Sequence, residues 1–163
     1  MIGKTMSVIS QTVVEAYTND GVLLIKSLLT QNVVSDLREG IDVNISNHCS
    51  CAQVASDEND PGWLLEDFCT WQENQAYQRV IFESDISKVA AKLMCSKEVR
   101  LFHDHMLVKK KGTLQRTPWQ QDQSYYNIEG KQNITFWITV DPVPLEWTLE
   151  FVAASHLDSW YMQ

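Results

Sequence analysis

Residues 134–140 carry the most regular period-two pattern of the chain, and this pattern constrains the fold more than any other. The even-numbered positions are all apolar: Ile134, Phe136, Ile138 and Val140. The odd-numbered positions carry two hydroxyls and a large aromatic ring: Thr135, Trp137 and Thr139. Because successive side chains of a β-strand point to opposite faces, the pattern predicts a strand with one apolar face. The opposite face is typical of a pocket lining, and it fits a half-exposed sheet face equally well.

Helical patterns come first along the chain. Thr30 is suited to cap a helix over about residues 31–45, in which Leu37 and Ile41 share one face. Ser84 is expected to cap a second helix with its own apolar face. The remaining expected elements are a partial helix within 1–18, a turn at 19–21, a short buried strand at 22–25, and a short helix or turn over 63–71.

Strand-like patterns dominate the second half, where they cover 99–108 and 148–153 besides 134–140. Helices followed by strands that turns separate predict an α+β chain, mainly β in its second half and built on an antiparallel sheet. With 163 residues and no internal repeat, the chain fits a single domain. Its helical part is expected over about 1–97 and its strands over about 99–163.

The charge balance argues against a dedicated nucleic-acid binder. Lys plus Arg is 13 and Asp plus Glu is 21, so the net charge is −8, whereas binding to phosphates requires a basic face. No stretch has the length of a membrane span or the character of a signal peptide. We therefore expect an intracellular, cytoplasmic protein without a membrane partner, and its four cysteines are expected to be reduced thiols.

Two short patterns have the composition of metal sites, and each has a simpler interpretation. Residues 48–51, His-Cys-Ser-Cys, provide half of a zinc site. No second Cys or His pair follows at zinc-site spacing, which favours a loop. His103 and His105 share one face of a predicted strand. They could bind a metal, but a pair packed and hydrogen-bonded on the sheet face is the favoured interpretation.

Residues 117–123, Thr-Pro-Trp-Gln-Gln-Asp-Gln, lie between two strand-like segments. On an extended segment Gln120 and Asp122 point to the same side, so they could offer two oxygen atoms to one ion. Non-haem Fe(II) oxygenases hold iron with two histidines and one carboxylate. In this chain a glutamine stands where such a site would place a histidine.

In one continuous register, the sequence resembles the phytanoyl-CoA dioxygenase family. The resemblance is carried by residues 102–109 (FHDHMLVK), residues 117–123, Trp137, and residues 149–156 (LEFVAASH). It implies a double-stranded β-helix, which is a cupin-like jelly-roll barrel, with the N-terminal helices packed outside. It also implies Fe(II), 2-oxoglutarate and oxygen as requirements for hydroxylating a small-molecule or acyl-CoA substrate.

The resemblance also implies roles for single residues. By position, Asp122 corresponds to the family's aspartate ligand to iron, and Gln120 stands at its first histidine ligand. Met106, Thr117 and Trp137 correspond to positions that contact 2-oxoglutarate.

The C-terminal part of the resemblance predicts an incomplete site. His156 is the only histidine after Asp122, and it corresponds to a structural turn of the family. The distal histidine and the arginine that the family uses would lie beyond residue 163, so the resemblance implies a barrel truncated at its C-terminus, whose open sheet edge could form a homodimer. Together with Gln120, this predicts impaired or absent dioxygenase activity. A non-catalytic binding or scaffolding module, or a fragment of a longer active oxygenase, is the alternative.

Overall fold

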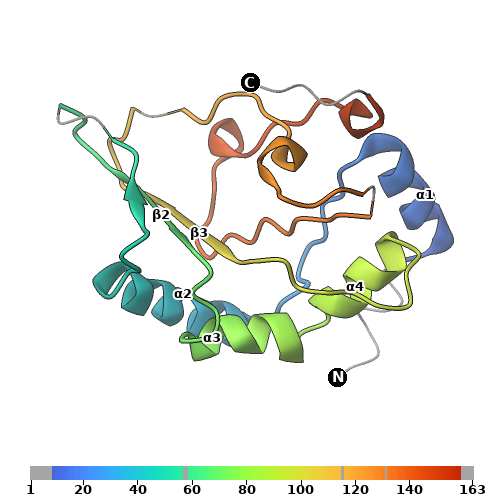
Figure 1. The fold of residues 1–163 in the computed structure, drawn as a ribbon, viewed down its shortest axis with the longest axis horizontal. Coiled ribbons are helices and arrows are strands. Elements are labelled where there is room, and N and C mark those ends of the chain that lie inside the picture. The colour runs from blue at the N-terminus through green and yellow to red at the C-terminus, as the bar shows by residue number, and fades with distance from the viewer. Residues whose placement is uncertain (1–8, 57–58, 115, 131, 159–163) are drawn as a thin grey trace. The chain divides into compact units, whose positions relative to one another are not determined.

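The computed structural model describes residues 9–56, 59–114, 116–130 and 132–158. The chain divides into two compact units, and Figure 1 traces it through both. Unit 1 comprises Met1–Thr30, Asp85–Val99 and Trp119–Gln163, and unit 2 comprises Gln31–Ser84 and Arg100–Pro118.

Each unit combines helices with extended or irregular segments. The described elements of unit 1 are α1 (Gln11–Asp20), α4 (Ile86–Leu93) and the 3-10 turns η2 (Asp122–Tyr125), η3 (Leu145–Trp147) and η4 (Ser155–Leu157). Those of unit 2 are α2 (Gln31–Ser46), β1 (Gln53–Val54), β2 (Leu64–Phe68), α3 (Gln75–Gln78), the π-helical turn η1 (Arg79–Glu83) and β3 (His105–Lys109).

Unit 2 is built on a three-stranded antiparallel sheet in the order β1-β2-β3. In the register of β2 and β3, Asp67 lies opposite Met106 and Phe68 lies opposite His105. Since side chains alternate between the faces of a sheet, Leu65, Asp67 and Met106 share one face. All three are buried, so this face is the inner side of the sheet.

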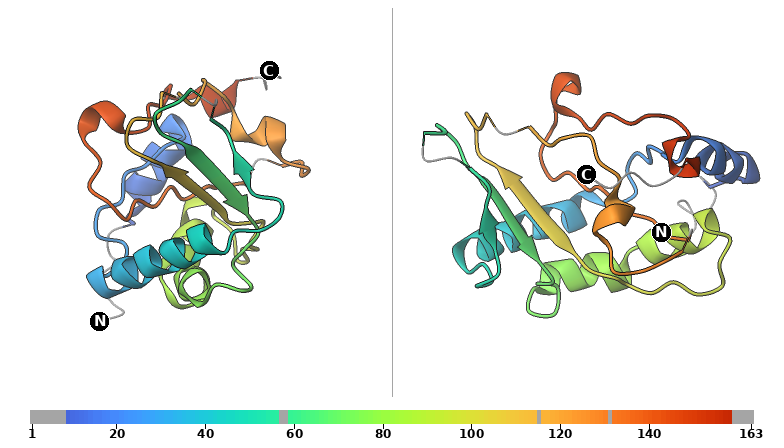
Figure 2. Two further views of the ribbon diagram at one scale, coloured as in Figure 1. Left: turned by 90° about the vertical axis from the view of Figure 1, so that its left-hand side faces the viewer. Right: turned by 45° about the horizontal axis from the view of Figure 1, so that its top comes forward.

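Helices α2 and α3 lie side by side in unit 2 (Figure 2). Gly40 allows their close approach, because a Cβ at this position would lie 2.6 Å from the Cβ of Ala76. Asn74 caps α3 by accepting from the backbone N–H of Ala76 at 3.1 Å, and its amide donates to the carbonyl of Gly40 at 2.9 Å. Asn44 of α2 donates to Asp67 at 2.6 Å, which ties the helix to the buried face of the sheet.

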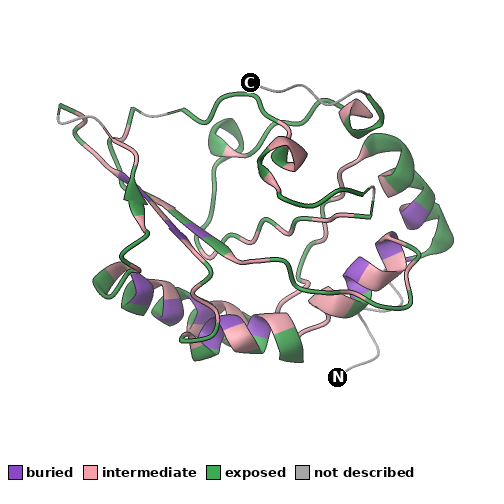
Figure 3. Ribbon diagram, viewed as in Figure 1, coloured by how far each residue is buried: buried purple, intermediate pink, exposed green. Residues whose placement is uncertain are grey.

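The core of unit 1 lies where α1 and α4 pack together, and Figure 3 shows the buried positions on both helices. Its buried residues are Ile9, Val14, Val89 and Leu93. Ile134 and Phe136 pack against this core as partly buried side chains. Full burial of an aliphatic side chain contributes roughly 1.5–3 kcal/mol, so each of the four buried residues adds substantially to the stability of the unit.

The helical predictions for the first half are largely confirmed. The helix over 31–45 is α2, the partial helix of the first 18 residues is α1, and the predicted turn follows α1 at Gly21, where φ is 78°. The prediction that Ser84 caps the next helix is wrong. That helix, α4, has Asp85 at its N-cap position, and the Ser84 hydroxyl donates instead to the carbonyl of Val80 in the preceding π-helical turn.

The prediction of a short helix or turn over residues 63–71 is also wrong, because this segment contains strand β2. A short apolar run has no decisive period and fits a buried strand as well as a helix. Pairing with β3, about 40 residues later in the chain, decides between them.

The strand predictions hold only in part. Within 99–108 the strand is restricted to β3, which begins at His105, and residues 22–25, 134–140 and 148–153 belong to no strand. A strand needs a partner at about 4.8 Å, and periodicity alone does not provide one. The alternation of burial is nevertheless as predicted in residues 134–139, where the apolar even-numbered positions are less exposed than their neighbours.

The α+β character is present, but the expected barrel is not confirmed. The described residues form a single sheet of three strands, and this sheet does not close on itself. The single domain over 1–163 stays a prediction, and both units draw on segments from each side of the expected division near residue 98. No helix in the described ranges is both long and apolar enough to cross a lipid bilayer.

Candidate functional site

The two predicted metal ligands contact each other. Asp122 is the first residue of η2, and Gln120 lies two residues before it. The amide nitrogen of Gln120 donates to Oδ1 of Asp122 at 3.4 Å, and both side chains are exposed. The nitrogen of the amide, rather than its oxygen, therefore faces the carboxylate. For Gln120 to offer an oxygen to an ion held by Asp122, its amide would have to turn over.

Tyr126 completes the surroundings of Asp122. Its hydroxyl lies 3.5 Å from Oδ2 of Asp122 and 3.4 Å from the hydroxyl of Thr135. Burial raises the pKa of Tyr126, and the negative charge of Asp122 and the hydrogen bond to it act in the same direction, whereas the hydrogen bond with Thr135 lowers it. Tyr126 therefore remains a neutral donor. Tyr126 was not among the residues predicted from the sequence, although its position four residues after Asp122 was a usable signal.

Hydrogen bonds from two other glutamines hold the loop that carries Asp122. Gln121 donates to the carbonyl of Ser155 at 3.3 Å, and Gln123 donates to the carbonyl of Ile128 at 2.6 Å. Asn133 donates to the side chain of Gln123 at 3.4 Å. All four residues of the run Gln-Gln-Asp-Gln thus have side-chain bonds to the loop itself or to a neighbouring segment, and the run is positioned without regular secondary structure before η2.

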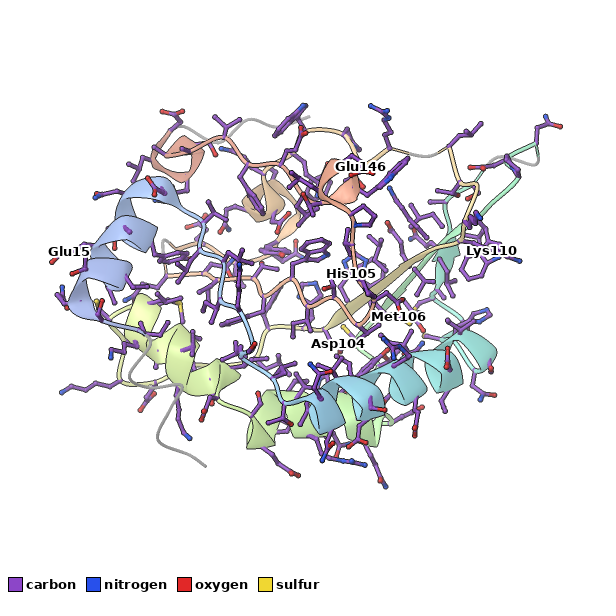
Figure 4. All side chains as sticks on the ribbon, turned by 180° about the vertical axis from the view of Figure 1, so that it is seen from behind. Glu15, Asp104, His105, Met106, Lys110 and Glu146 are labelled. Atoms are coloured by element: carbon purple, nitrogen blue, oxygen red, sulfur yellow. The ribbon has the colours of Figure 1, made fainter. Side chains whose placement is uncertain are left out.

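The residues expected to contact 2-oxoglutarate belong to different units. Met106 and Thr117 lie in unit 2, whereas Trp137 lies in unit 1 together with Gln120 and Asp122. Met106 is only 5% exposed on the inner face of the sheet, and Trp137 is 52% exposed. Figure 4 shows Met106 on β3 beside His105 and Asp104. The cosubstrate roles of Met106, Thr117 and Trp137 stay predictions.

The two histidines near β3 contact aromatic rings. His105 stacks on Phe68 with the ring centroids 4.1 Å apart, and His103 stacks on the same ring at 6.5 Å. His103 also meets Phe102 edge to face at 4.8 Å. These contacts favour the packed pair over a metal site, and neither histidine belongs to a potential metal cluster among the described residues.

His156 has a structural contact in unit 1. Its Nε2 lies 3.0 Å from the carbonyl oxygen of Thr18, near the end of α1. The backbone N–H of Ala154 donates to the carbonyl of Asp20 at 3.0 Å. Both bonds satisfy carbonyl groups in the last turn of α1, which have no hydrogen-bond partner within the helix itself. This arrangement agrees with the turn position that the sequence predicts for His156.

A second constellation joins the end of α2 to the inner face of the sheet. The potential ligand atoms of Cys49, Cys51 and Asp67 all lie within 4.8 Å of one another. The Cys51 thiol donates to Sγ of Cys49 at 2.6 Å, and this bond lowers the pKa of Cys49 and raises that of Cys51. The sequence pattern indicated the two cysteines but not Asp67, because strand β2 was not predicted.

A polar network continues from Asp67 to the segment before β3. Asn44 links Asp67 to Thr70, whose hydroxyl lies 2.8 Å from Oδ1 of Asn44 and 3.1 Å from Oδ2 of Asp104. Asp104 also accepts from the backbone N–H groups of Thr70 and Trp71, both at 3.2 Å. The network fixes the turn after β2 against the segment that leads into β3. The bonds among Asn44, Thr70 and Asp104 therefore have a structural role.

The comparison with known families decides the lineage. A family model described as phytanoyl-CoA dioxygenase (PhyH) matches residues 17–161, which is most of the chain. The chain belongs to the phytanoyl-CoA dioxygenase family. Neither a curated protein nor a solved structure matches it. Membership implies a cupin-like fold and a dioxygenase lineage that generally depends on Fe(II) and 2-oxoglutarate.

The residues present do not fit the iron site of a phytanoyl-CoA dioxygenase. At the two predicted ligand positions, 120 and 122, the chain offers one neutral amide and one carboxylate, and the amide nitrogen is hydrogen-bonded to that carboxylate. An amide carries no charge and is a weaker donor to Fe(II) than a neutral imidazole.

Proposed function

We propose that this phytanoyl-CoA dioxygenase-family protein has impaired or absent oxygenase activity and that residues 120–122 are the remnant of its metal site. The observation that supports the proposal is the 3.4 Å hydrogen bond from the Gln120 amide to Asp122. In place of two metal ligands that converge on one ion, the pair forms a donor and an acceptor that satisfy each other.

The magnitude of the expected defect follows from metal chemistry. Changes that only affect groups behind the ligands reduce metal affinity or activity roughly 10–100-fold, so loss of a ligand is expected to cost at least as much. Asp122 is exposed, so water also competes for the ion. If activity remains, we propose a small molecule or an acyl-CoA thioester as substrate, with Met106, Thr117 and Trp137 contacting 2-oxoglutarate.

The second candidate function is a non-catalytic binding or scaffolding module. Unit 1 exposes several large aromatic side chains by more than half, which is unusual for residues of this size. They are Trp119, Tyr125, Trp137, Trp147 and Phe151.

A non-catalytic module could also act as a homodimer. We propose that two copies pair along strand β3, which lies at one edge of the three-stranded sheet. Light scattering over a range of protein concentrations tests the dimer, and a constant monomer mass would exclude it.

Anaerobic calorimetric titration with Fe(II), in the presence of 2-oxoglutarate, tests the main proposal. The unchanged protein is expected to bind iron weakly or not at all, and Gln120→His is expected to gain affinity. Asn127→His is the matched control, because Asn127 is an exposed residue of the same loop and a histidine there should gain nothing. Adding Asp122→Ala to Gln120→His should remove the gain.

The outcomes separate the two candidates. Stoichiometric binding at micromolar affinity by the unchanged protein, followed by oxygen-dependent consumption of 2-oxoglutarate, would overturn the proposal of impaired activity. Binding by Gln120→His alone would show that one residue silences the site. Binding by neither would place the defect beyond residue 120 and favour the binding module.

A further inference from the structure

Cys49, Cys51 and Asp67 converge from two parts of unit 2. The cysteines lie in the irregular segment after α2, and Asp67 lies on the inner face of β2. Their three ligand atoms lie within 4.8 Å of one another. The backbone N–H of Cys49 also donates to Oδ2 of Asp67 at 3.0 Å, so the carboxylate fixes the position of the first cysteine.

Asp67 is a buried carboxylate without a positive partner among the described residues. It is 0% exposed, and its donors are all neutral: the Asn44 amide at 2.6 Å and the backbone N–H groups of Cys49 at 3.0 Å and Phe68 at 2.9 Å. A carboxylate has about four acceptor positions, so one remains. Buried charges are normally paired or bound to a metal. A cation at the remaining position would supply the missing countercharge.

We propose that Cys49, Cys51 and Asp67 form a binding site for a thiophilic divalent cation of the zinc class. Two thiolates and one carboxylate are three ligands of the kinds that Zn²⁺ accepts, and a water molecule can take the fourth corner of a tetrahedron. Hard cations such as Mg²⁺ and Ca²⁺ prefer oxygen ligands only. The site is separate from Gln120 and Asp122 and does not depend on the oxygenase proposal.

The geometry requires one adjustment, which the local structure permits. The two sulfur atoms are 2.6 Å apart, whereas two thiolates on a tetrahedral zinc ion are separated by about 3.8 Å, given Zn–S bonds of about 2.3 Å. Cys51 is exposed and lies in a segment of turns between α2 and β1. Its side chain can therefore rotate away from Cys49, which the hydrogen bond to Asp67 holds in place.

The alternative use of two adjacent thiols is a disulfide, and the experiment distinguishes the two. The full chain, reduced and freed of metals with a chelator that is then removed, is titrated with Co²⁺. A site with two thiolates gives a thiolate-to-cobalt charge-transfer absorption in the near ultraviolet, and one equivalent of Zn²⁺ should abolish it. A chain that gives no such band while reduced, and loses two of its four free thiols in air, would overturn the proposal in favour of the disulfide.

Variants assign the ligands. Cys49→Ser and Cys51→Ser should each weaken Co²⁺ binding by more than about 100-fold and reduce the band. Asp67→Asn should weaken binding while retaining the band of two thiolates. Cys95→Ser is the matched control, since Cys95 is an exposed free cysteine of unit 1, and it should leave the titration unchanged. A band that survives in both Cys49→Ser and Cys51→Ser would overturn the assignment.

Thermal unfolding provides a second readout. Zn²⁺ that binds only the folded chain raises the unfolding midpoint as its concentration increases. We expect this shift in the unchanged protein and in Asp122→Asn, and we expect it to be lost in Cys51→Ser. Because Cys51 is exposed, its substitution decides the question even if Asp67→Asn does not fold. A shift that Asp122→Asn abolishes would place the metal at the oxygenase position and contradict the inference.

Discussion

The imidazole of His156 lies against the backbone of Gly21, so close that a Cβ on Gly21 would lie 2.3 Å from Nδ1 of His156. Gly21 ends α1 in the left-handed conformation, with φ of 78°, and its N–H donates to the carbonyl of Tyr17. The His156 ring therefore covers the C-terminal end of α1 at Gly21, which has no side chain.

Gly21→Ala is expected to destabilise unit 1 for two reasons. The left-handed backbone costs a residue with a Cβ about 1–2 kcal/mol, and the overlap with His156 adds to this. In a His156→Ala background the overlap is gone, so the same substitution should cost only the backbone contribution. Urea unfolding of the four proteins measures this coupling. Equal costs of Gly21→Ala in both backgrounds would mean that the two residues do not touch.

Tyr77→Phe is expected to stabilise the protein at neutral pH by about 1 kcal/mol, because the buried Tyr77 hydroxyl has no hydrogen-bond partner among the described residues. Burial raises the pKa of Tyr77 well above its ordinary value of 10, and the negative charges of Asp104 and Asp67 raise it further. The folded state therefore keeps a proton that the unfolded chain loses above pH 10.

Because the pKa of Tyr77 is higher in the folded state, holding the proton contributes to the free energy of unfolding. This contribution is fully present below pH 10, the ordinary pKa of the unfolded chain's tyrosine. Above it, the free energy of unfolding falls by up to about 1.4 kcal/mol per pH unit for this group. Tyr77→Phe should make the alkaline decline less steep. Urea unfolding between pH 8 and about pH 11 measures the decline, and an unaltered slope in Tyr77→Phe would contradict the assignment.

Phe136 and Trp137 are neighbours in the segment 134–140, and they should differ in their contribution to the free energy of unfolding. Phe136→Ala removes a ring that packs on the core of unit 1 and should cost about 2–4 kcal/mol. Trp137→Ala removes a ring that is 52% exposed and should cost less than about 1 kcal/mol. Denaturant unfolding gives both values. A larger loss for Trp137→Ala would reverse the assignment of the two faces.

The parts of the fold that the sequence predicted are those with local causes. Helix α2 follows from the spacing of its apolar residues, and the turn at Gly21 follows from a glycine after asparagine and aspartate. Strand β2 depends on pairing with β3, so nothing within Leu64–Phe68 specifies it. In residues 134–140 the pattern predicted which side chains are less exposed, but pairing into a strand requires a partner that periodicity does not reveal.

The same distinction holds for the sites. Gln120 and Asp122 are two residues apart, and the predicted proximity is found, whereas the direction of the Gln120 amide depends on a hydrogen bond. Asp67 is 18 residues from Cys49 and joins it only through the register of the sheet. A motif search that looks for two pairs of Cys or His residues does not find a site completed by one carboxylate from a strand.

The interleaving of the two units sets an order for folding during synthesis. Unit 2 has all its segments once Pro118 has been made, whereas unit 1 also draws on Trp119–Gln163. The contacts of Asp67 and Asp104 in unit 2 can therefore form once residues up to 118 have left the ribosome, before all segments of unit 1 are available. Helix α1 precedes unit 2 in the chain, but its core also includes contacts with Phe136 and its C-terminal end also contacts His156. Helix α1 is thus completed by segments that are synthesised after the sheet of unit 2.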